Sequence, residues 1–316
     1  MPFLHAMIAM AAAVLPASDD WIAARGTGTC SATDVDFSDT RQGLASCAFS
    51  DAMTTNDGGL TWSVFPTGLQ QSLVFAHAQS ASELYLARLG VYRSHDGGAS
   101  WTEVGNLSSH FGSVFDMHFD GTRYVALQGG NVLYSEDSGA NWQTGFAAQS
   151  GVYLDELHFP SSDVGYATGG ITSEQGSLGS VVRTQDAGVS WTLLPFANGQ
   201  ITAADFLDPS HGIVATLSSN VYATADSGAS WQLLGTLPNT AYLTDIGHRS
   251  DTHWYGTDVS GCIYESRTGG TSWSATYCDP SGRALAALSL QKAAGVAVGN
   301  DGLVVYENRI FPDGFE

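Results

Sequence analysis

One turn motif occurs six times along this chain of 316 residues, and it constrains the fold more than any other feature. Its pattern is [ST]-x-D-x-G-x-x-W, which we call the box, and only the sixth copy departs from it, with Thr268 at the Asp position. The copies are TNDGGLTW (55–62), SHDGGASW (94–101), SEDSGANW (135–142), TQDAGVSW (184–191), TADSGASW (224–231) and SRTGGTSW (266–273). Successive box tryptophans are 39, 41, 49, 40 and 42 residues apart. A period near 40 residues predicts a repeat architecture in which each repeat is one structural unit.

The residue types of the box favour a tight connection between two strands over a catalytic centre. Gly supplies a positive φ, the Asp side chain bonds to the backbone of its own turn, and Trp buries its ring beneath that turn. One Asp per repeat does not give the paired carboxylates that glycoside hydrolysis needs. We therefore assign a structural role to the box residues Asp57, Asp96, Asp137, Asp186, Asp226, Trp62, Trp101, Trp142, Trp191, Trp231 and Trp273.

Each repeat also contains four short segments rich in β-branched and aromatic residues, and no stretch shows helical periodicity. After the last box, residues 283–290, 295–298 and 303–307 predict three more strands without a box, and residues 21–24 predict a lone strand before the first repeat. Joining the two ends completes a seventh unit and leaves no open sheet edge. The sequence thus predicts an all-β, seven-bladed β-propeller of four-stranded antiparallel blades, with the N-terminal strand as the outer strand of the C-terminal blade.

The segments that precede the boxes carry a family resemblance. DFSDTRQG (36–43) aligns without a gap with DFLDPSHG (205–212), and Phe159 and Gly165 keep the same six-residue step from Phe to Gly. Together with the box, these segments resemble the Asp-box (BNR) repeats of β-propellers. They are most similar to the repeats of photosystem II assembly and stability factors, and more distantly similar to sialidases and sortilin-type receptors. The resemblance covers nearly all of the chain after residue 20 and implies the propeller fold, but such propellers host unrelated activities.

The two ends of the chain predict export. Residues 1–17 form an apolar run that ends in small residues and resembles a secretory signal peptide, although it contains no Lys or Arg; the alternative is a misassigned start. We expect the propeller to span residues 18–309 and the protein to be periplasmic or secreted. Residues 310–316 (IFPDGFE) resemble a short C-terminal tail of some secreted bacterial proteins, and the alternative is a disordered end.

Charge and cysteine content limit the partners and cofactors. The net charge is −20 and Lys292 is the only lysine, so the chain should repel nucleic acid and anionic lipid. An even number of cysteines in an exported chain suggests disulfides. No C-x-x-C spacing supports zinc, and we expect neither a metal nor a cofactor. Two cysteines lie symmetrically about the sixth box and two flank the first predicted hairpin, which predicts the pairs Cys30–Cys47 and Cys262–Cys278.

Binding is expected on the face opposite the boxes, where second strands connect to third strands and outer strands connect to the next blade. We call this the loop face. A longer loop at 171–180 accounts for the 49-residue step in the fourth repeat. Aromatic side chains beside Ser, Gly, Gln and Asn suit a peptide or a sugar, and the alternative is ordinary solvated loops. The predicted binding residues are Phe111, Tyr153, Phe196, Tyr242, Tyr277 and Arg283.

A second candidate site lies on the predicted inner strands. Aligning the repeats places an Asp or a His at one position in five successive blades, facing the central channel. These residues are a candidate metal or proton-sensitive site, because His and Asp are metal ligands and His titrates near neutrality. The alternative, which we favour, is a repeated hydrogen bond from a side chain to the backbone that links blades. The residues are Asp36, His77, His118, His158 and Asp205.

For function, the resemblance implies a scaffold more than an enzyme. Sialidase-like enzymes need an arginine cluster, a Tyr nucleophile with a Glu partner and an acid/base Asp, but this chain has only ten arginines and no F/Y-R-I-P segment. Xyloglucanase-like enzymes use two propellers, and this chain has room for one. Photosystem II factors are expected to present an arginine-rich patch, which is not evident here. We therefore predict a monomeric, non-enzymatic propeller that binds a membrane or envelope protein, with a glycan-binding module or a sialidase-like glycoside hydrolase as alternatives.

Overall fold

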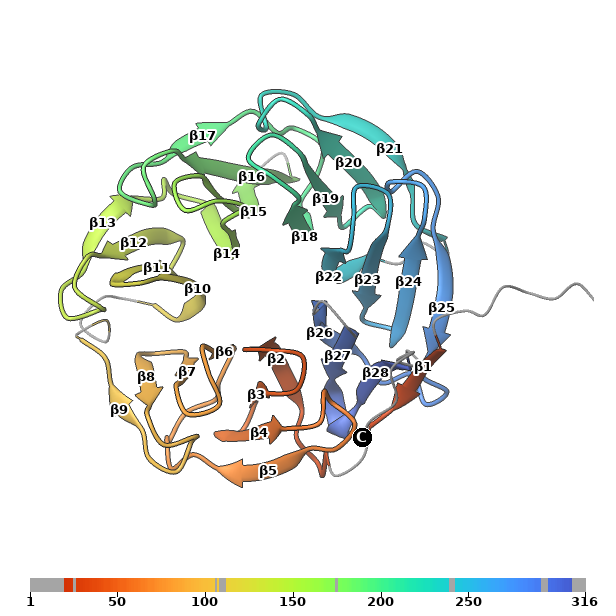
Figure 1. The fold of residues 1–316 in the computed structure, drawn as a ribbon. Helices are drawn as coiled ribbons and strands as arrows, with labels where there is room; N and C mark the ends of the chain where they lie inside the picture. Colours follow the sequence, from red (N-terminus) through yellow and green to blue (C-terminus); the bar gives the residue numbers. More distant parts are fainter. Residues whose placement is uncertain are drawn as a thin grey trace, which may run out of the picture.

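Seven four-stranded antiparallel sheets are arranged as blades around a central channel, as predicted (Figure 1). The computed structural model describes residues 20–24, 27–105, 107, 112–173, 176–238, 242–290 and 295–308. The predicted signal peptide and C-terminal tail lie outside these residues. In the described part of the chain, no helix is long and apolar enough to span a bilayer.

The inner and second strands form the centre of each blade. The inner strands, which line the channel, are β2 (Ala32–Phe37), β6 (Phe75–Ala78), β10 (Val114–Asp120), β14 (Val152–His158), β18 (Ile201–Phe206), β22 (Leu243–His248) and β26 (Leu285–Leu290). The second strands are β3 (Gly43–Cys47), β7 (Leu84–Ala87), β11 (Arg123–Gln128), β15 (Gly165–Ser173), β19 (Gly212–Thr216), β23 (Trp254–Asp258) and β27 (Gly295–Gly299). Every residue of β3, β7, β19, β23 and β27 is buried, because both faces of these strands pack against neighbouring blades.

The third and outer strands complete each blade toward the rim. The third strands are β4 (Asp51–Thr55), β8 (Val91–Ser94), β12 (Asn131–Ser135), β16 (Gly176–Thr184), β20 (Asn220–Thr224), β24 (Cys262–Ser266) and β28 (Val304–Asn308). The outer strands are β5 (Ser63–Pro66), β9 (Thr102–Glu103), β13 (Gln143–Phe146), β17 (Thr192–Leu194), β21 (Gln232–Thr236), β25 (Ser274–Cys278) and, for the last blade, β1 (Asp20–Ala23).

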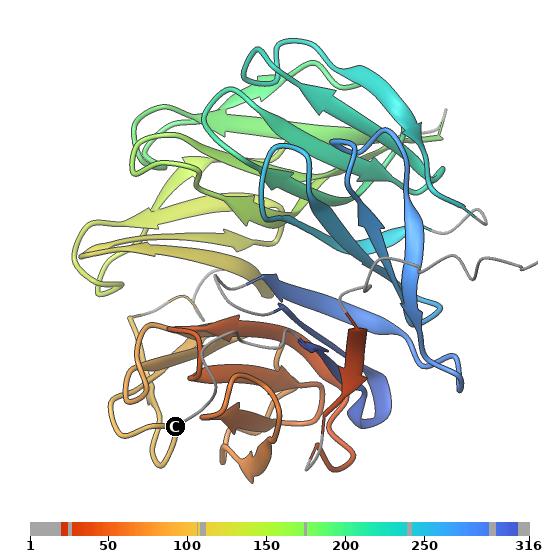
Figure 2. The same cartoon turned by 45° about the vertical axis from the view of Figure 1, so that its right-hand side comes forward.

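The predicted closure between the two ends of the chain is confirmed. Strand β1 lies beside β28 and pairs with it antiparallel (Figure 2). In that register Trp21 lies opposite Glu307. Trp21 is buried and its ring meets Tyr255 of the sixth blade edge-on, with 5.7 Å between the ring centroids. The N-terminal strand therefore satisfies the edge of β28 and also ties the seventh blade to the sixth.

The Phe-to-Gly step seen in the sequence has a packing reason. A Cβ atom added to Gly165 would lie 2.6 Å from the ring of Phe159, so only glycine leaves room for that ring. The same ring meets the box tryptophan of its own blade, Trp191, edge-on at 6.0 Å. Phe37 of the first blade repeats this arrangement between Gly43 and Trp62. The two sequence motifs of a repeat thus form one aromatic contact inside a blade.

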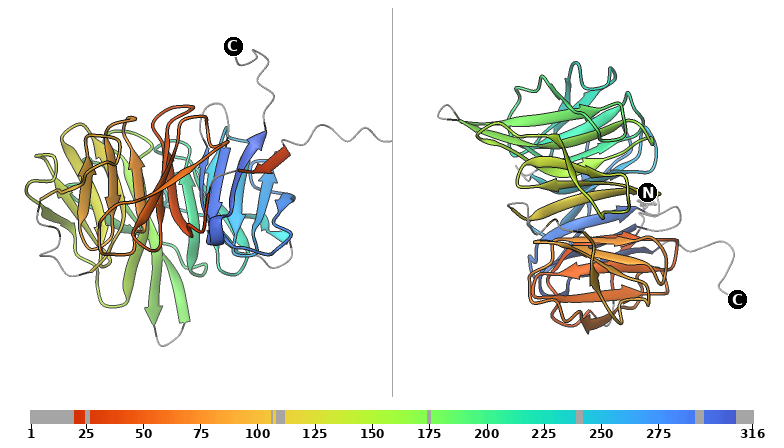
Figure 3. Two further views of the ribbon diagram at one scale, coloured as in Figure 1. Left: turned by 90° about the horizontal axis from the view of Figure 1, so that it is seen from below. Right: turned by 90° about the vertical axis from the view of Figure 1, so that its left-hand side faces the viewer.

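The fourth blade differs from the prediction. Residues 171–180 were expected to form a long loop, but β15 and β16 continue through this segment as a hairpin, with Thr172 opposite Ser177 and Ser173 opposite Gly176. The extended hairpin projects from the ring, beyond the other blades (Figure 3, left). The insertion adds residues to both strands in register, so pairing continues where the sequence, rich in Ser and Gly, suggested a loop.

Both predicted disulfides are present. Cys30–Cys47 joins the segment before β2 to the end of β3, and Cys262–Cys278 joins β24 to β25. Cys30 and Cys47 are buried, whereas Cys278 is exposed. The two bonds therefore differ in their access to solvent.

Candidate functional site: the two faces and the central channel

Hydrogen bonds show which connections share a face. The box turns bond to the connection between the first and second strands of the same blade; Gly58 N, for example, donates to the carbonyl of Arg41, and Ser227 N to that of Ser210. At the other end of the blade, the turn between second and third strands bonds to the connection that leaves the outer strand; Leu237 N donates to the carbonyl of Ser219. The boxes thus lie on one face, which we call the box face, and the loop face lies opposite.

The first five boxes share one set of hydrogen bonds that join the Ser or Thr, the Asp and the backbone of the turn. In the fourth box, the hydroxyl of Thr184 donates to Asp186 Oδ1 (2.8 Å) and accepts the N–H of Gly188 (3.0 Å), while Asp186 Oδ2 accepts the hydroxyl of Ser190 (2.6 Å). The indole N–H of Trp191 donates to the Gly188 carbonyl at 2.9 Å. These bonds engage both carboxylate oxygens, and side-chain and backbone donors lower the pKa of the box aspartates Asp57, Asp96, Asp137, Asp186 and Asp226.

Two of the five predicted channel residues link neighbouring blades by hydrogen bonds to the backbone. Asp36 Oδ2 accepts the N–H of Ala78 in the next blade at 3.0 Å, and Asp205 Oδ2 accepts the N–H of His248 at 3.0 Å. Asp36 also pairs with His77 Nδ1 at 2.7 Å. The same oxygen of Asp205 contacts the His248 ring, so both aspartates meet a histidine of the following blade.

The three predicted channel histidines stack on aromatic rings of the following blade. His77 lies 4.7 Å from Phe119 and His118 lies 4.1 Å from Phe159, both nearly parallel, and His158 lies 5.8 Å from Phe206 at a tilt. Burial lowers the pKa of His118 to about 4, so this imidazole is neutral at physiological pH. In the described residues, no group of three or more His, Cys, Asp or Glu side chains is placed to hold a metal ion.

A further tier of carboxyl groups in the channel was missed in the sequence. Asp34 Oδ2 accepts the N–H of Ala76 at 2.8 Å, and its Oδ1 accepts the N–H of Val35. This double contact recurs in two other blades, where Asp116 accepts the N–H of Leu157 and Asp245 accepts the N–H of Leu288. In the fourth blade Glu156 occupies the equivalent position and accepts the hydroxyl of Thr168 at 3.4 Å. The sequence could have indicated these residues, because each acid lies two residues before the aligned channel position of its repeat. In the structure each lies next to a β-bulge.

These carboxyl groups hold protons more tightly than usual. Burial raises the pKa of Asp34 to about 6; the charge of Asp36 adds to this effect and the N–H of Ala76 opposes it. Burial also raises the pKa of Asp116, Glu156 and Asp245 well above the usual range, and neighbouring carboxylates add to it. Each side chain keeps some surface open to the channel, yet the surrounding wall removes most of its hydration. The channel is thus an acidic, proton-holding passage.

The predicted loop-face residues differ in how far they are exposed. Tyr153 is half-buried, with its ring over Gly170, and Phe196 is buried, edge-on to Trp231 at 5.4 Å. Phe196 therefore packs in the interior beneath the loop face and is not available to a ligand. Tyr242, in the connection that enters the sixth blade, and Tyr277, on β25 of that blade, are both half-buried. Arg283 donates to both oxygens of Asp279 (2.8 and 3.2 Å), and Phe111 lies outside the described residues.

The most exposed apolar side chains of the loop face were not predicted. They lie in connections between second and third strands, or on the hairpin of the fourth blade, and each belongs to a different blade. We call them the tip residues: Phe49, Leu89, Leu178, Leu217 and Val259. No sequence motif marks them, because such turns have no common length or composition.

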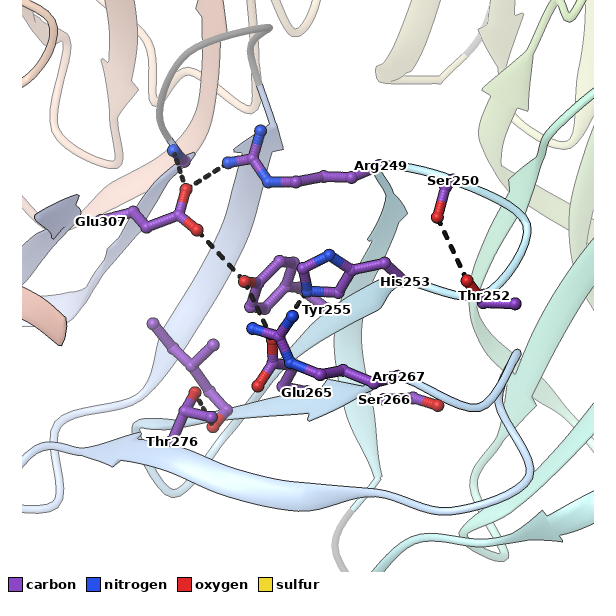
Figure 4. Close-up of polar contacts among 12 residues, drawn as sticks. Arg249, Ser250, Thr252, His253, Tyr255, Glu265, Ser266, Arg267, Thr276 and Glu307 are labelled. Carbon is purple, nitrogen blue, oxygen red and sulfur yellow. Dashed lines mark hydrogen bonds and ion pairs between the residues drawn. The ribbon is translucent and has the colours of Figure 1, made fainter. Parts of the chain in front are cut away.

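One cluster on the box face contains a Tyr, two Glu and two Arg, the residue types expected of a sialidase site (Figure 4). The Tyr255 hydroxyl lies 3.2 Å from Glu265 and 3.1 Å from Glu307; Arg267 pairs with Glu265, and Arg249 pairs with Glu307. Tyr255 is fully buried, so a sugar does not reach its hydroxyl. The cluster joins the sixth and seventh blades.

The second blade repeats part of this cluster. There the Tyr85 hydroxyl donates to Glu83 at 2.8 Å, and Glu83 also pairs with Arg93. Tyr85 is fully buried as well. A Tyr–Glu–Arg contact that recurs in a second blade and is closed to solvent is best explained as packing between blades.

A cleft of about 400 Å³ lies between the fifth and sixth blades on the box face. Trp231, Trp254 and Leu234 form much of its apolar lining, and Asp226 and His211 contribute polar groups. Asp226 is already engaged by the hydrogen bonds of its own box. The cleft is thus a surface depression beside a structural turn.

Solved structures share the fold. A structure described as "YCF48 bound to D1 peptide" has 19% sequence identity and a TM-score of 0.73, covering 91% of this chain and 96% of that one. YCF48 from Cyanidioschyzon merolae has 16% identity and a TM-score of 0.73 over 91% and 98% of the two chains. The GH74 xyloglucanase from Xanthomonas campestris has 14% identity and a TM-score of 0.71 over 93% of this chain but only 54% of the enzyme. No protein-family model and no curated protein matches the sequence. At these identities, the similarities show the propeller fold alone.

Proposed function

We propose that this chain is an exported, non-enzymatic propeller of the Asp-box family that binds a protein partner through its loop face. The observation that carries the proposal is the contrast between the two faces. The box face is occupied by turns whose polar groups are bonded to one another, whereas the loop face presents apolar side chains that no other part of the described chain covers. Exposed apolar side chains gathered on one face are a feature of interaction sites.

Binding of a protein is also supported by analogy. A propeller of the same fold is described as bound to a peptide, D1. The present chain carries a net charge of −20 and few arginines, so we do not extend the D1 partner to it. We propose a membrane or envelope protein as the partner and a monomer as the free state. A glycan ligand is the alternative.

Export is part of the proposal. Residues 1–17 would be a signal peptide removed from a mature chain that begins near residue 18, with the propeller at 18–309 and a short tail at 310–316. The two disulfides support an oxidising compartment such as the periplasm or the cell exterior.

Crosslinked affinity capture from the envelope of the native host, read by mass spectrometry, tests this function. We expect a stoichiometric protein whose recovery falls when Tyr153 and Tyr242 of the loop face are changed to Ala. The matched control is His211→Ala, because His211 is exposed on the box face. Capture that is unaffected by the loop-face changes, or lost in the control, would contradict the proposed face. Hydrolysis of a glycoside panel would contradict the non-enzymatic assignment.

A further inference from the structure

The tip residues put large apolar side chains where turns ordinarily have small polar ones. Connections of this kind favour Gly, Asn, Asp and Ser, which suit tight backbone conformations and water. The exposed fractions of the tip residues instead range from 40% for Val259 to 79% for Phe49. Phe49 and Leu89 belong to neighbouring blades, and Leu178, Leu217 and Val259 to three successive blades. The tips therefore form two arcs on the loop face.

The other exposed apolar side chains do not extend onto the box face. Val64, Leu193 and Leu233 occupy outer strands at the rim, each two residues after a box tryptophan. Ile22 lies on β1 at the rim, and Phe115 lies on the inner strand β10. Among the described residues, none of the exposed large apolar side chains lies in a box turn or in a connection between first and second strands. Exposed large apolar side chains therefore occur in the connections of the loop face but not in those of the box face.

The two faces also differ in the charged residues of their connections. In the described connections of the loop face, the Asp, Glu, Lys and Arg side chains are Arg88, Asp279, Arg283 and Asp301, and Asp279 is paired with Arg283. The described connections of the box face contain three arginines, Arg41, Arg249 and Arg267, and a larger set of acids. These acids are Asp39, Asp57, Glu83, Asp96, Glu136, Asp137, Asp163, Asp186, Asp208, Asp226 and Asp251. The described connections of the loop face are therefore nearly balanced in charge, with Asp51 and Glu103 at adjoining strand ends, whereas those of the box face are strongly acidic.

The uneven shape of the loop face argues against a flat lipid bilayer as its binding partner. The hairpin of β15 and β16 projects beyond the other blades on this side (Figure 3, left). A bilayer pressed against the tips would have to accommodate β15 and β16, which extend past the other blades. The described connections of this face also contain no cluster of basic residues of the kind that binds anionic headgroups. A protein segment lying beside the hairpin meets neither difficulty.

We propose that the two arcs of tip residues bind apolar, non-acidic protein segments that lie across neighbouring blades. This inference rests on the proposed function and names the contact residues and the chemistry of the partner. Apolar contacts at the tips supply the affinity, and Phe49, as the largest and most exposed tip, is the expected anchor. The overall negative charge repels acidic segments before contact, whereas an apolar segment meets few charged side chains in the loop-face connections.

The test uses a phage-displayed library of random 12-residue peptides, selected on the mature protein. We expect enrichment of apolar sequences without Asp or Glu. A synthetic peptide of an enriched sequence should then bind about tenfold more weakly to the double variants Phe49→Ser/Leu89→Ser or Leu217→Ser/Val259→Ser, or to both. The matched control is Val64→Ser/Leu233→Ser, which removes exposed apolar side chains from the rim and should change the dissociation constant less than twofold. Thermal unfolding confirms that each variant is folded, which we expect because all of these side chains are exposed.

Other outcomes would overturn the inference in distinguishable ways. If no peptide is enriched, or if acidic peptides are enriched, the partner is not an apolar, non-acidic segment. Another outcome is peptide binding that is unaffected by all tip changes but lost when Tyr153 and Tyr242 are changed to Ala. That result would show that the tips are not the contact residues, while the proposed function of the loop face would stand. Binding to vesicles of phosphatidylcholine that depends on the tips, without peptide enrichment, assigns the face to a membrane.

Discussion

The carboxylate of Asp34 in the first blade accepts the backbone N–H of Ala76 in the second blade at 2.8 Å. Adjacent blades are separate sheets, so their backbones do not pair along the channel as strands within a sheet do. Asp116 and Asp245 fill the same role at two other junctions, and burial raises the pKa of all three carboxyl groups. The stability of the ring therefore depends on pH through groups that sit between blades.

We predict that the protein is more stable at pH 5 than at pH 7.5. The pKa of Asp34 is 3.8 when unfolded and about 6 when folded, so the native state binds more protons between these values and stability falls as pH rises through them. Asp116, Glu156 and Asp245 act in the same direction, whereas His118, with its pKa lowered to about 4, acts oppositely. We expect the free energy of unfolding in urea to be lower at pH 7.5 than at pH 5.

The variant Asp34→Asn tests the origin of this dependence. The amide oxygen keeps one acceptor for the Ala76 N–H but removes the titration, so the change in stability between pH 5 and pH 7.5 should shrink. Asp163→Asn, which removes an exposed carboxylate on the box face, is the control and should leave the dependence as it was. Equal stability of the unmodified protein at both pH values would show that the channel carboxyl groups do not control it.

The parts of the molecule that the sequence predicted are those set by local chemistry. The box repeats because its Asp, Gly and Trp bond and pack within one turn, so its period revealed six blades, and the unmatched strands at the two ends revealed the seventh. The acids Asp34, Asp116 and Asp245 were missed because their partners lie about forty residues away, in another blade. The tips were missed because exposure at a turn depends on whether another part of the chain covers it. For the same reason Phe196 was wrongly predicted to be exposed for binding, because other parts of the chain cover it.

The closure of the ring predicts unequal effects for two neighbouring residues of β1. Trp21 is 6% exposed and packs on Tyr255, whereas Ile22 is 38% exposed. Trp21→Ala should lower the free energy of unfolding by about 3–5 kcal/mol, because it removes a large buried ring. Ile22→Ala should cost less than about 1 kcal/mol. Urea unfolding followed by circular dichroism measures both, and similar costs for the two changes would contradict a closure that depends on Trp21.

The two disulfides should differ in their resistance to reductant. Cys278 is exposed, while Cys30 and Cys47 are both buried. Because a thiolate must reach a sulfur atom for exchange, the Cys262–Cys278 bond should open at lower dithiothreitol concentrations than Cys30–Cys47. Alkylation of the native protein followed by peptide mass spectrometry should first label Cys262 and Cys278. Labelling of all four cysteines at one concentration would mean that access does not separate the bonds, or that the first reduction unfolds the protein.

The sixth box offers a reciprocal test of what the box aspartate contributes. Asp186 of the fourth box accepts three hydrogen bonds, from the Thr184 hydroxyl and from the N–H and hydroxyl of Ser190, at 2.6–2.8 Å. In the sixth box, the single oxygen of Thr268 accepts the N–H of Ser272 at 3.0 Å and contacts its hydroxyl at 2.8 Å. Thr268→Asp should therefore raise the free energy of unfolding by about 1 kcal/mol, and Asp186→Thr should lower it by a similar amount.

The new carboxylate of Thr268→Asp would also lie next to Arg267 in sequence, so the measurement needs a control for charge. Unfolding is measured at 0.1 M and at about 1 M salt, where screening weakens attraction between exposed charges but leaves short hydrogen bonds in place. A gain that persists in high salt assigns the effect to the turn. A gain that disappears assigns it to Arg267, and no gain at all would mean that the hydroxyl of Thr268 already serves the turn as well as a carboxylate does.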